Sequence, residues 1–136
     1  DAMIPENQKS ALDVRYPSSH PFPPPDGSGL IPPVDSSRFN LSGEMAVWVN
    51  DQLSPQPPKT VSQPIKLTGA WSQVPQKVYI RATCYEAPWF DRFLAEKSSD
   101  PDWETYSYPW GHDMMITHPE ELAKLLTTFA RSPGDR

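Results

Sequence analysis

The sequence has a single cysteine, Cys84, no cluster of Lys or Arg, and no long apolar run. One cysteine cannot form an internal disulfide and has no partner at zinc-binding spacing, so we expect Cys84 to be a half-buried thiol at a strand end. The formal net charge of −5 argues against binding to nucleic acid, which needs concentrated positive charge. No segment approaches the ~18 apolar residues of a membrane span. These absences indicate a soluble chain.

Glycine is also scarce, with six residues, whereas proline is abundant, with 18. Seven of these prolines fall within residues 17–35, a density that no helix or central strand tolerates. The segment therefore predicts a long surface loop of the lid or binding type. Apolar residues at helical spacing predict a short helix over 43–53, which is too small to be a domain. We assign residues 17–65 to a cap or lid segment.

Residues 66–136 have the pattern of a parallel α/β fold, because strands and helices alternate with short loops between them. Two such strands cannot form a parallel sheet alone, so we expect the missing strands to lie outside this chain. Residues 1–16 read as the end of one further strand followed by a turn and a short helix. The expected strands are 76–84 and 103–108, and the expected helices are 88–97 and a final one that starts with a capping box at Thr117.

One motif carries the chemistry: the run YPWGHDMM at residues 108–115, between the last strand and the last helix. Ligands gather at the carboxyl ends of strands in open α/β sheets, so His112 is expected to project towards a reaction centre. Gly111 lets the backbone turn sharply before it. The alternative is a histidine that only caps a loop.

The run GHDMM at 111–115, followed by HPEELA at 118–123, resembles the histidine loop and final helix of the α/β-hydrolase superfamily. The closest likeness is to the branch of small esterases, hydroxynitrile lyases and plant methyl esterases. DAMIPE at 1–6 resembles the DAFVPE stretch that follows the sixth sheet strand in such enzymes. The resemblance implies that this chain is the C-terminal half of the fold, and that a partner chain completes the sheet.

What the resemblance implies chemically is a Ser–His–acid triad, with His112 as general base and acid. The serine normally lies on a G-x-S-x-G turn, which this sequence lacks, so it is expected on a partner chain holding the N-terminal half. Tyr85 stands where many relatives keep the acid. Asp1 is the preferred acid and Glu86 the alternative, whereas Asp91 and Asp113 are expected to be structural.

The implied reaction is hydrolysis of an ester, lactone or amide bond in a small hydrophobic substrate. Trp48, Trp89 and Trp110 are candidates for lining its pocket, or alternatively for packing. No cofactor is implied. No metal site is expected, because His20 and His118 lack partners at ligand spacing and should be solvated or on the surface.

Two rival functions follow from the same residues. A lyase of this fold would use a cap residue such as Lys59 or Thr60, and a non-catalytic homologue would keep the pocket as a receptor. Retention of His112 argues against the receptor. No signal-like segment opens the sequence, and the cellular location stays open, with a slight preference for the cytoplasm.

Overall fold

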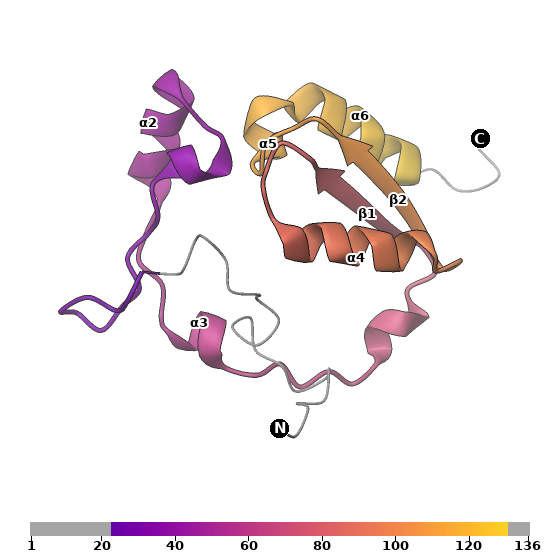
Figure 1. Ribbon diagram of the computed structural model, residues 1–136, viewed down its shortest axis with the longest axis horizontal. Helices are drawn as coiled ribbons and strands as arrows, with labels where there is room; N and C mark the ends of the chain where they lie inside the picture. Colours follow the sequence, from indigo (N-terminus) through magenta and orange to yellow (C-terminus); the bar gives the residue numbers. More distant parts are fainter. Residues whose placement is uncertain (1–22, 131–136) are drawn as a thin grey trace.

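A computed structural model describes residues 23–130 of the chain (Figure 1). Asp1, His20 and the expected elements of residues 1–16 lie outside the described residues. Strands and helices alternate in the second half, as the sequence predicts. In chain order the elements are η2 (Ser36–Phe39), α2 (Gly43–Gln52), α3 (Lys59–Ser62), η3 (Ala70–Gln73), β1 (Lys77–Ala82), α4 (Pro88–Ser98), β2 (Trp103–Tyr108), α5 (Met114–Thr117) and α6 (Pro119–Ala130).

The two predicted strands pair in parallel, in a register that runs from Lys77 opposite Trp103 to Ala82 opposite Tyr108. Their β-branched and aromatic side chains favour extended backbone. The α4 helix makes the crossover between them, and its start fits Pro88, whose ring suits the first turn of a helix. Both predicted strands and the crossover helix are confirmed, with ends that differ by at most two residues.

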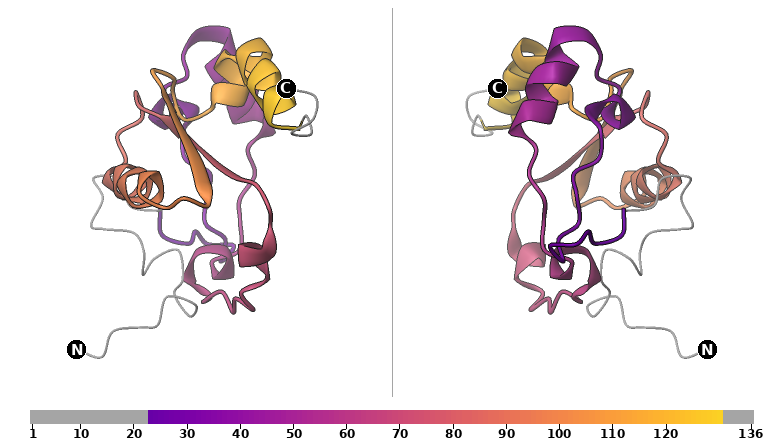
Figure 2. Two further views of the ribbon diagram at one scale, coloured as in Figure 1. Left: turned by 90° about the vertical axis from the view of Figure 1, so that its right-hand side faces the viewer. Right: turned by 90° about the vertical axis from the view of Figure 1, so that its left-hand side faces the viewer.

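Helices α4 and α6 lie on opposite faces of the sheet, as Figures 1 and 2 show. Phe93 of α4 packs edge-on against Tyr79 of β1, at 4.9 Å between ring centroids, and against Trp103 of β2 at 5.7 Å. On the other face, Phe129 of α6 meets Tyr106 at 5.2 Å. This division follows from the strand period, because successive side chains point to opposite faces.

Packing on the α6 face is incomplete within residues 23–130. No residue of α6 is buried, and the apolar side chain of Leu126 in this helix is 51% exposed. Most residues of β1 and β2 are only half-buried. Parallel sheets normally have both faces covered and several neighbouring strands, so this sheet carries more apolar surface than the described chain covers.

The cap segment contains a closed loop, residues 31–56, whose ends are joined by an antiparallel bridge between Ile31 and Gln56. Their backbone groups exchange hydrogen bonds of 2.8 and 2.9 Å. The predicted helix over 43–53 is confirmed as α2. Its expected apolar face is only partly buried, however, because Val49 is buried but Trp48 is 56% exposed. We call residues 31–56 the cap loop.

A polar network holds η2 against α2 inside the cap loop. Ser36 is fully buried; its N–H donates to Asn50 Oδ1 at 2.9 Å and its hydroxyl donates to the Ala46 carbonyl at 3.1 Å. The Asn50 amide donates in turn to Asp35 at 3.0 Å. Hydrogen bonds from Ser37 and then Asn50 lower the pKa of Asp35. The side chain of Asn50 therefore joins the two helices of the cap loop.

Replacing Asn50 by alanine is expected to lower the free energy of unfolding by about 1–3 kcal/mol, because the buried Ser36 N–H loses its acceptor. Chemical denaturation of the variant measures the change. The control is Asp51→Ala on the exposed neighbouring position, which should change stability by less than about 0.5 kcal/mol. Equal midpoints for the two variants would contradict this account of the network.

Three local expectations are corrected. The final helix starts at Pro119 and is preceded by a separate helical turn, α5. The Thr117 hydroxyl bonds His118 Nδ1 at 2.8 Å rather than serving a capping box. His118 is half-buried rather than on the surface, because its ring stacks on Trp110 at 5.0 Å. Cys84 is exposed, since β1 ends at Ala82 and a turn follows.

Candidate functional site

The loop that carries His112 is held against the loop that follows β1. The Tyr108 carbonyl accepts from the Thr83 N–H at 2.8 Å and from its hydroxyl at 3.0 Å, and the Trp110 carbonyl accepts from the Cys84 N–H at 3.1 Å. The pairing of the strands thus continues past their ends. It brings the segments after both strands together at the carboxyl edge of the sheet, where α/β proteins bind ligands.

His112 forms a close pair with the next residue in the chain. Its Nδ1 lies 2.6 Å from Asp113 Oδ1, with side-chain exposures of 37% for His112 and 16% for Asp113. A carboxylate at Nδ1 favours the tautomer that carries its proton there, which leaves the Nε2 lone pair free. That arrangement is the one a general base requires.

Two aromatic rings flank the imidazole. Tyr85, from the loop after β1, meets it edge-on with 4.7 Å between ring centroids. Phe39, from the cap loop, lies at 4.9 Å with the planes inclined by 34°. The imidazole therefore packs between the loop after β1 and the cap loop, and these contacts restrict rotation of the His112 side chain.

The cap loop touches the histidine loop at Gly111. A Cβ placed on Gly111 would lie 2.9 Å from Asn40 Cβ and 3.2 Å from the Phe39 carbonyl oxygen. Asn40 itself has a left-handed backbone, with φ of 67°, which turns the chain at the end of η2. Glycine is thus needed at 111 because the cap backbone approaches it closely, a reason additional to the sharp turn inferred from the sequence.

Replacing Gly111 by alanine is expected to destabilise the protein by about 1–3 kcal/mol, because the backbone and a Cβ atom must move to admit the new methyl group. Denaturant unfolding measures the loss. Gly27→Ala is the matched control, because nothing lies within 4 Å of a Cβ there. Indistinguishable stabilities of the two variants would mean that the cap loop does not dock on Gly111.

The other predicted site residues are distributed as follows. Glu86 is exposed, and among residues 23–130 no hydrogen bond or ion pair joins it to His112. Trp110 is buried, and its ring stacks with that of Tyr108, at 4.2 Å and nearly parallel, and with that of His118 at 5.0 Å. Trp48 is exposed on the cap helix, and Trp89 packs edge-on against Phe90. The roles of these tryptophans in substrate binding stay predictions.

Thr60, one of the cap residues considered for a lyase, has its hydroxyl bonded to the Pro57 carbonyl at 2.6 Å. Within the described part of the chain, no group of three His, Cys, Asp or Glu side chains is arranged to hold a metal ion. No helix between residues 23 and 130 is long and apolar enough to span a bilayer.

The structure brings together residues that the sequence did not assign to the site. Asp113, to which the sequence assigned a structural role, is the carboxylate that contacts His112 Nδ1, and its part in catalysis stays a prediction. Tyr85 was noted only as a departure at the usual acid position, and it packs on the imidazole. Asp113 could have been found from its place beside His112, whereas the contact with Phe39 joins positions far apart in the chain.

Comparison with known proteins gives one informative match. The chain is 36% identical over 101 residues to the carbendazim hydrolyzing esterase of Nocardioides sp. (strain SG-4G). The match covers 74% of this chain and 42% of the esterase, so the chain spans less than half of that relative's length. No family model and no solved structure matches the sequence.

Proposed function

We propose that this chain is part of an ester-hydrolysing enzyme of the α/β-hydrolase type and supplies its general base, His112. The observation that carries the proposal is the His112–Asp113 pair at the carboxyl edge of a parallel sheet, 2.6 Å between Nδ1 and Oδ1. The similarity to a protein named as an esterase supports the choice of reaction. The substrate class is a small molecule with an ester-like bond: an ester, lactone or amide.

In the proposed reaction, His112 Nε2 takes the proton of a serine hydroxyl as that oxygen attacks the substrate carbonyl. The imidazolium then gives the proton to the departing alcohol or amine, which leaves an acyl-serine. Water attacks the acyl group with the same histidine as base, and the acid product is released with the serine restored. The Asp113 carboxylate stabilises the imidazolium and fixes its orientation.

The serine and the oxyanion-binding groups are proposed to lie on a segment outside this chain. Two observations favour this. The sheet and α6 leave apolar side chains such as Leu126 exposed, and the esterase that matches the chain is more than twice as long as the matched segment. Further parallel strands beside the described pair would cover that surface and complete the sheet.

The cap loop is proposed to form one wall of the substrate site, because Phe39 already contacts the imidazole from that side. Trp48 on α2 offers a large exposed apolar surface in the same loop. Together they fit a hydrophobic substrate. Carbendazim is a suitable first test compound, since the matched relative is named for hydrolysing it.

A covalent serine-directed fluorophosphonate probe tests the proposal on the complete protein, that is, this chain together with the segment proposed to complete it. We expect the probe to label one serine outside residues 1–136, identified by mass spectrometry of the peptides. Excess carbendazim or a simple aryl ester should slow the labelling. A complete protein that is folded, hydrolyses none of these compounds and takes up no probe would refute the proposal and favour a non-catalytic binding protein.

A further inference from the structure

Arg81 is a buried cation that the proposed reaction does not use. It lies near the end of β1 and faces α4, and its side chain is only 3% exposed. Removing a guanidinium from water costs several kcal/mol unless its donors are satisfied. The burial of Arg81 therefore requires acceptors for the N–H groups of its guanidinium.

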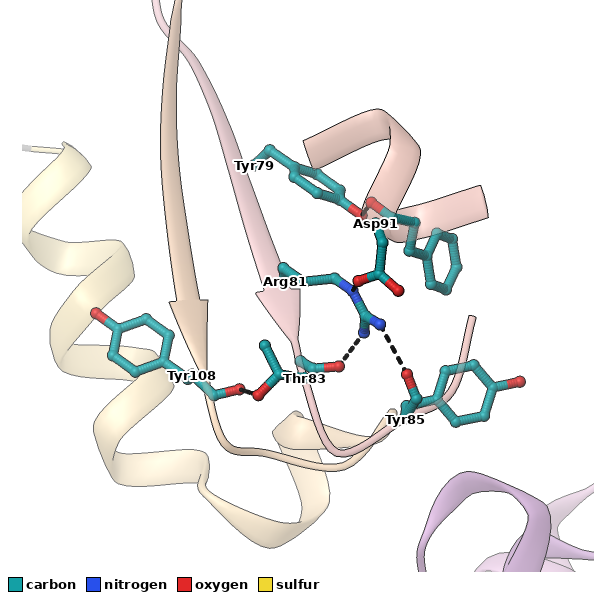
Figure 3. A network of polar contacts seen from close by, with 8 residues as sticks. Tyr79, Arg81, Thr83, Tyr85, Asp91 and Tyr108 are labelled. Atoms are coloured by element: carbon teal, nitrogen blue, oxygen red, sulfur yellow. Dashed lines mark hydrogen bonds and ion pairs between the residues drawn. The ribbon is translucent and has the colours of Figure 1, made fainter. Parts of the chain in front are cut away.

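Each part of the guanidinium has an acceptor, as Figure 3 shows. Nε lies 2.7 Å from Asp91 Oδ1, a carboxylate in the first turn of α4. One terminal nitrogen donates to the Ala82 carbonyl and the other to the Tyr85 carbonyl, the latter at 2.8 Å. The planar fork thus ties the loop after β1 to the sheet and to the start of α4.

The loop after β1 also contacts the imidazole of His112. The Tyr85 carbonyl accepts from Arg81, and the Tyr85 ring meets the His112 ring at 4.7 Å. A direct chain of contacts therefore runs from Asp91 through Arg81 and Tyr85 to His112. Hydrogen bonds from Thr83 and Cys84 to the segment before His112 fix the same loop from its other side.

We propose that Arg81 is a positioning residue: by holding the Tyr85 backbone it places the aromatic ring that orients His112. The expected effect on catalysis rests on the proposed function, whereas the placement of the Tyr85 ring against His112 does not. The chemistry demands Arg, because a lysine ammonium is a single point of charge that cannot reach the carboxylate and both carbonyls in one plane.

The test compares Arg81→Lys with Asp91→Asn in the complete protein. Asp91→Asn is the matched control, because an amide oxygen can still accept from Nε and the two carbonyl contacts remain. Aromatic rings shift the NMR resonances of protons near them. We expect Arg81→Lys to move the ring-proton resonances of His112 and Asp91→Asn to leave them in place. We expect kcat of Arg81→Lys to fall by about ten- to a hundredfold with KM nearly unchanged, because the base is misplaced while substrate contacts persist.

If Arg81→Lys does not fold, Tyr85→Leu replaces it in the test. The Tyr85→Leu variant retains the backbone carbonyl that accepts from Arg81 but lacks the aromatic ring. Tyr85→Phe is its control and should preserve the His112 resonances. Loss of the Tyr85 ring alters the His112 shifts by itself, so Tyr85→Leu is judged by kcat. Unchanged His112 resonances in folded Arg81→Lys, or equal kcat in Tyr85→Leu and Tyr85→Phe, would overturn the inference. The NMR result needs no enzymatic activity, so a protein without esterase activity would refute the proposed function and leave the positioning of His112 separately measurable.

Discussion

Replacing His112 by glutamine in the complete protein is expected to lower kcat for ester hydrolysis by about 10²–10⁴-fold, the usual contribution of a positioned general base. Glutamine is close to histidine in size and can still bond Asp113, but it cannot take up the proton of a hydroxyl nucleophile. KM should change little, because the lost interaction belongs to the transition state. Steady-state kinetics on an aryl ester or on carbendazim measures both constants.

His118→Gln is the control for this experiment. His118 stacks on Trp110, and its Nδ1 bonds the neighbouring Thr117 hydroxyl, so it has a packing role away from the proposed chemistry. Its variant should keep kcat nearly unchanged and lose some stability. If kcat survives in His112→Gln, or falls as far in His118→Gln, the assignment of the base to His112 is wrong.

Replacing Asp113 by asparagine is expected to have an effect of comparable size, a fall in kcat of about 10²–10⁴-fold. An amide facing Nδ1 can donate to it, which favours the tautomer with the proton on Nε2 and removes the basic lone pair from the reacting side. The charge that stabilises the imidazolium is lost as well. The 2.6 Å contact in the structure is the reason to expect a large effect from a residue next in sequence to the base.

Asp1→Asn and Glu86→Gln complete the comparison of carboxylates. Glu86 is exposed, and its variant should behave like the unaltered protein. Asp1, the acid that the sequence favours, lies outside the described residues, and its variant distinguishes two arrangements. A large loss for Asp1→Asn with little for Asp113→Asn would make Asp1 the triad acid and Asp113 a structural neighbour. The reverse result would place the acid beside the base in the chain.

The secondary structure around His112 was predictable because it depends on short-range patterns. Apolar spacing identified α2 and α6, β-branched and aromatic runs identified β1 and β2, and prolines marked where elements begin. The helical turn α5 was missed, since four residues, Met114–Thr117, are too few to show a period. Apolar side chains of α2 and α6 are exposed in the described part of the chain, because a pattern shows which face of a helix is apolar but not what lies against it.

The site was predictable only in part. The sequence singled out His112 from its position after a strand and from a resemblance carried by neighbouring residues. It preferred Asp1 to Glu86 as the acid and did not show that Asp113 pairs with His112, because the direction in which Asp113 points depends on the backbone after the strand. It also could not reveal that Tyr85 and Phe39 pack against the imidazole of His112.

The sequence by itself determined the α/β class of the second half, the crossover through α4 and the place of the histidine at a strand end, since each follows from local spacing and composition. Only the tertiary structure decided which side chains surround that histidine. Arg81, Tyr85, Phe39 and Gly111 are brought together by parallel pairing and by the return of the cap loop. Those contacts join residues up to some seventy positions apart, and no local preference encodes them.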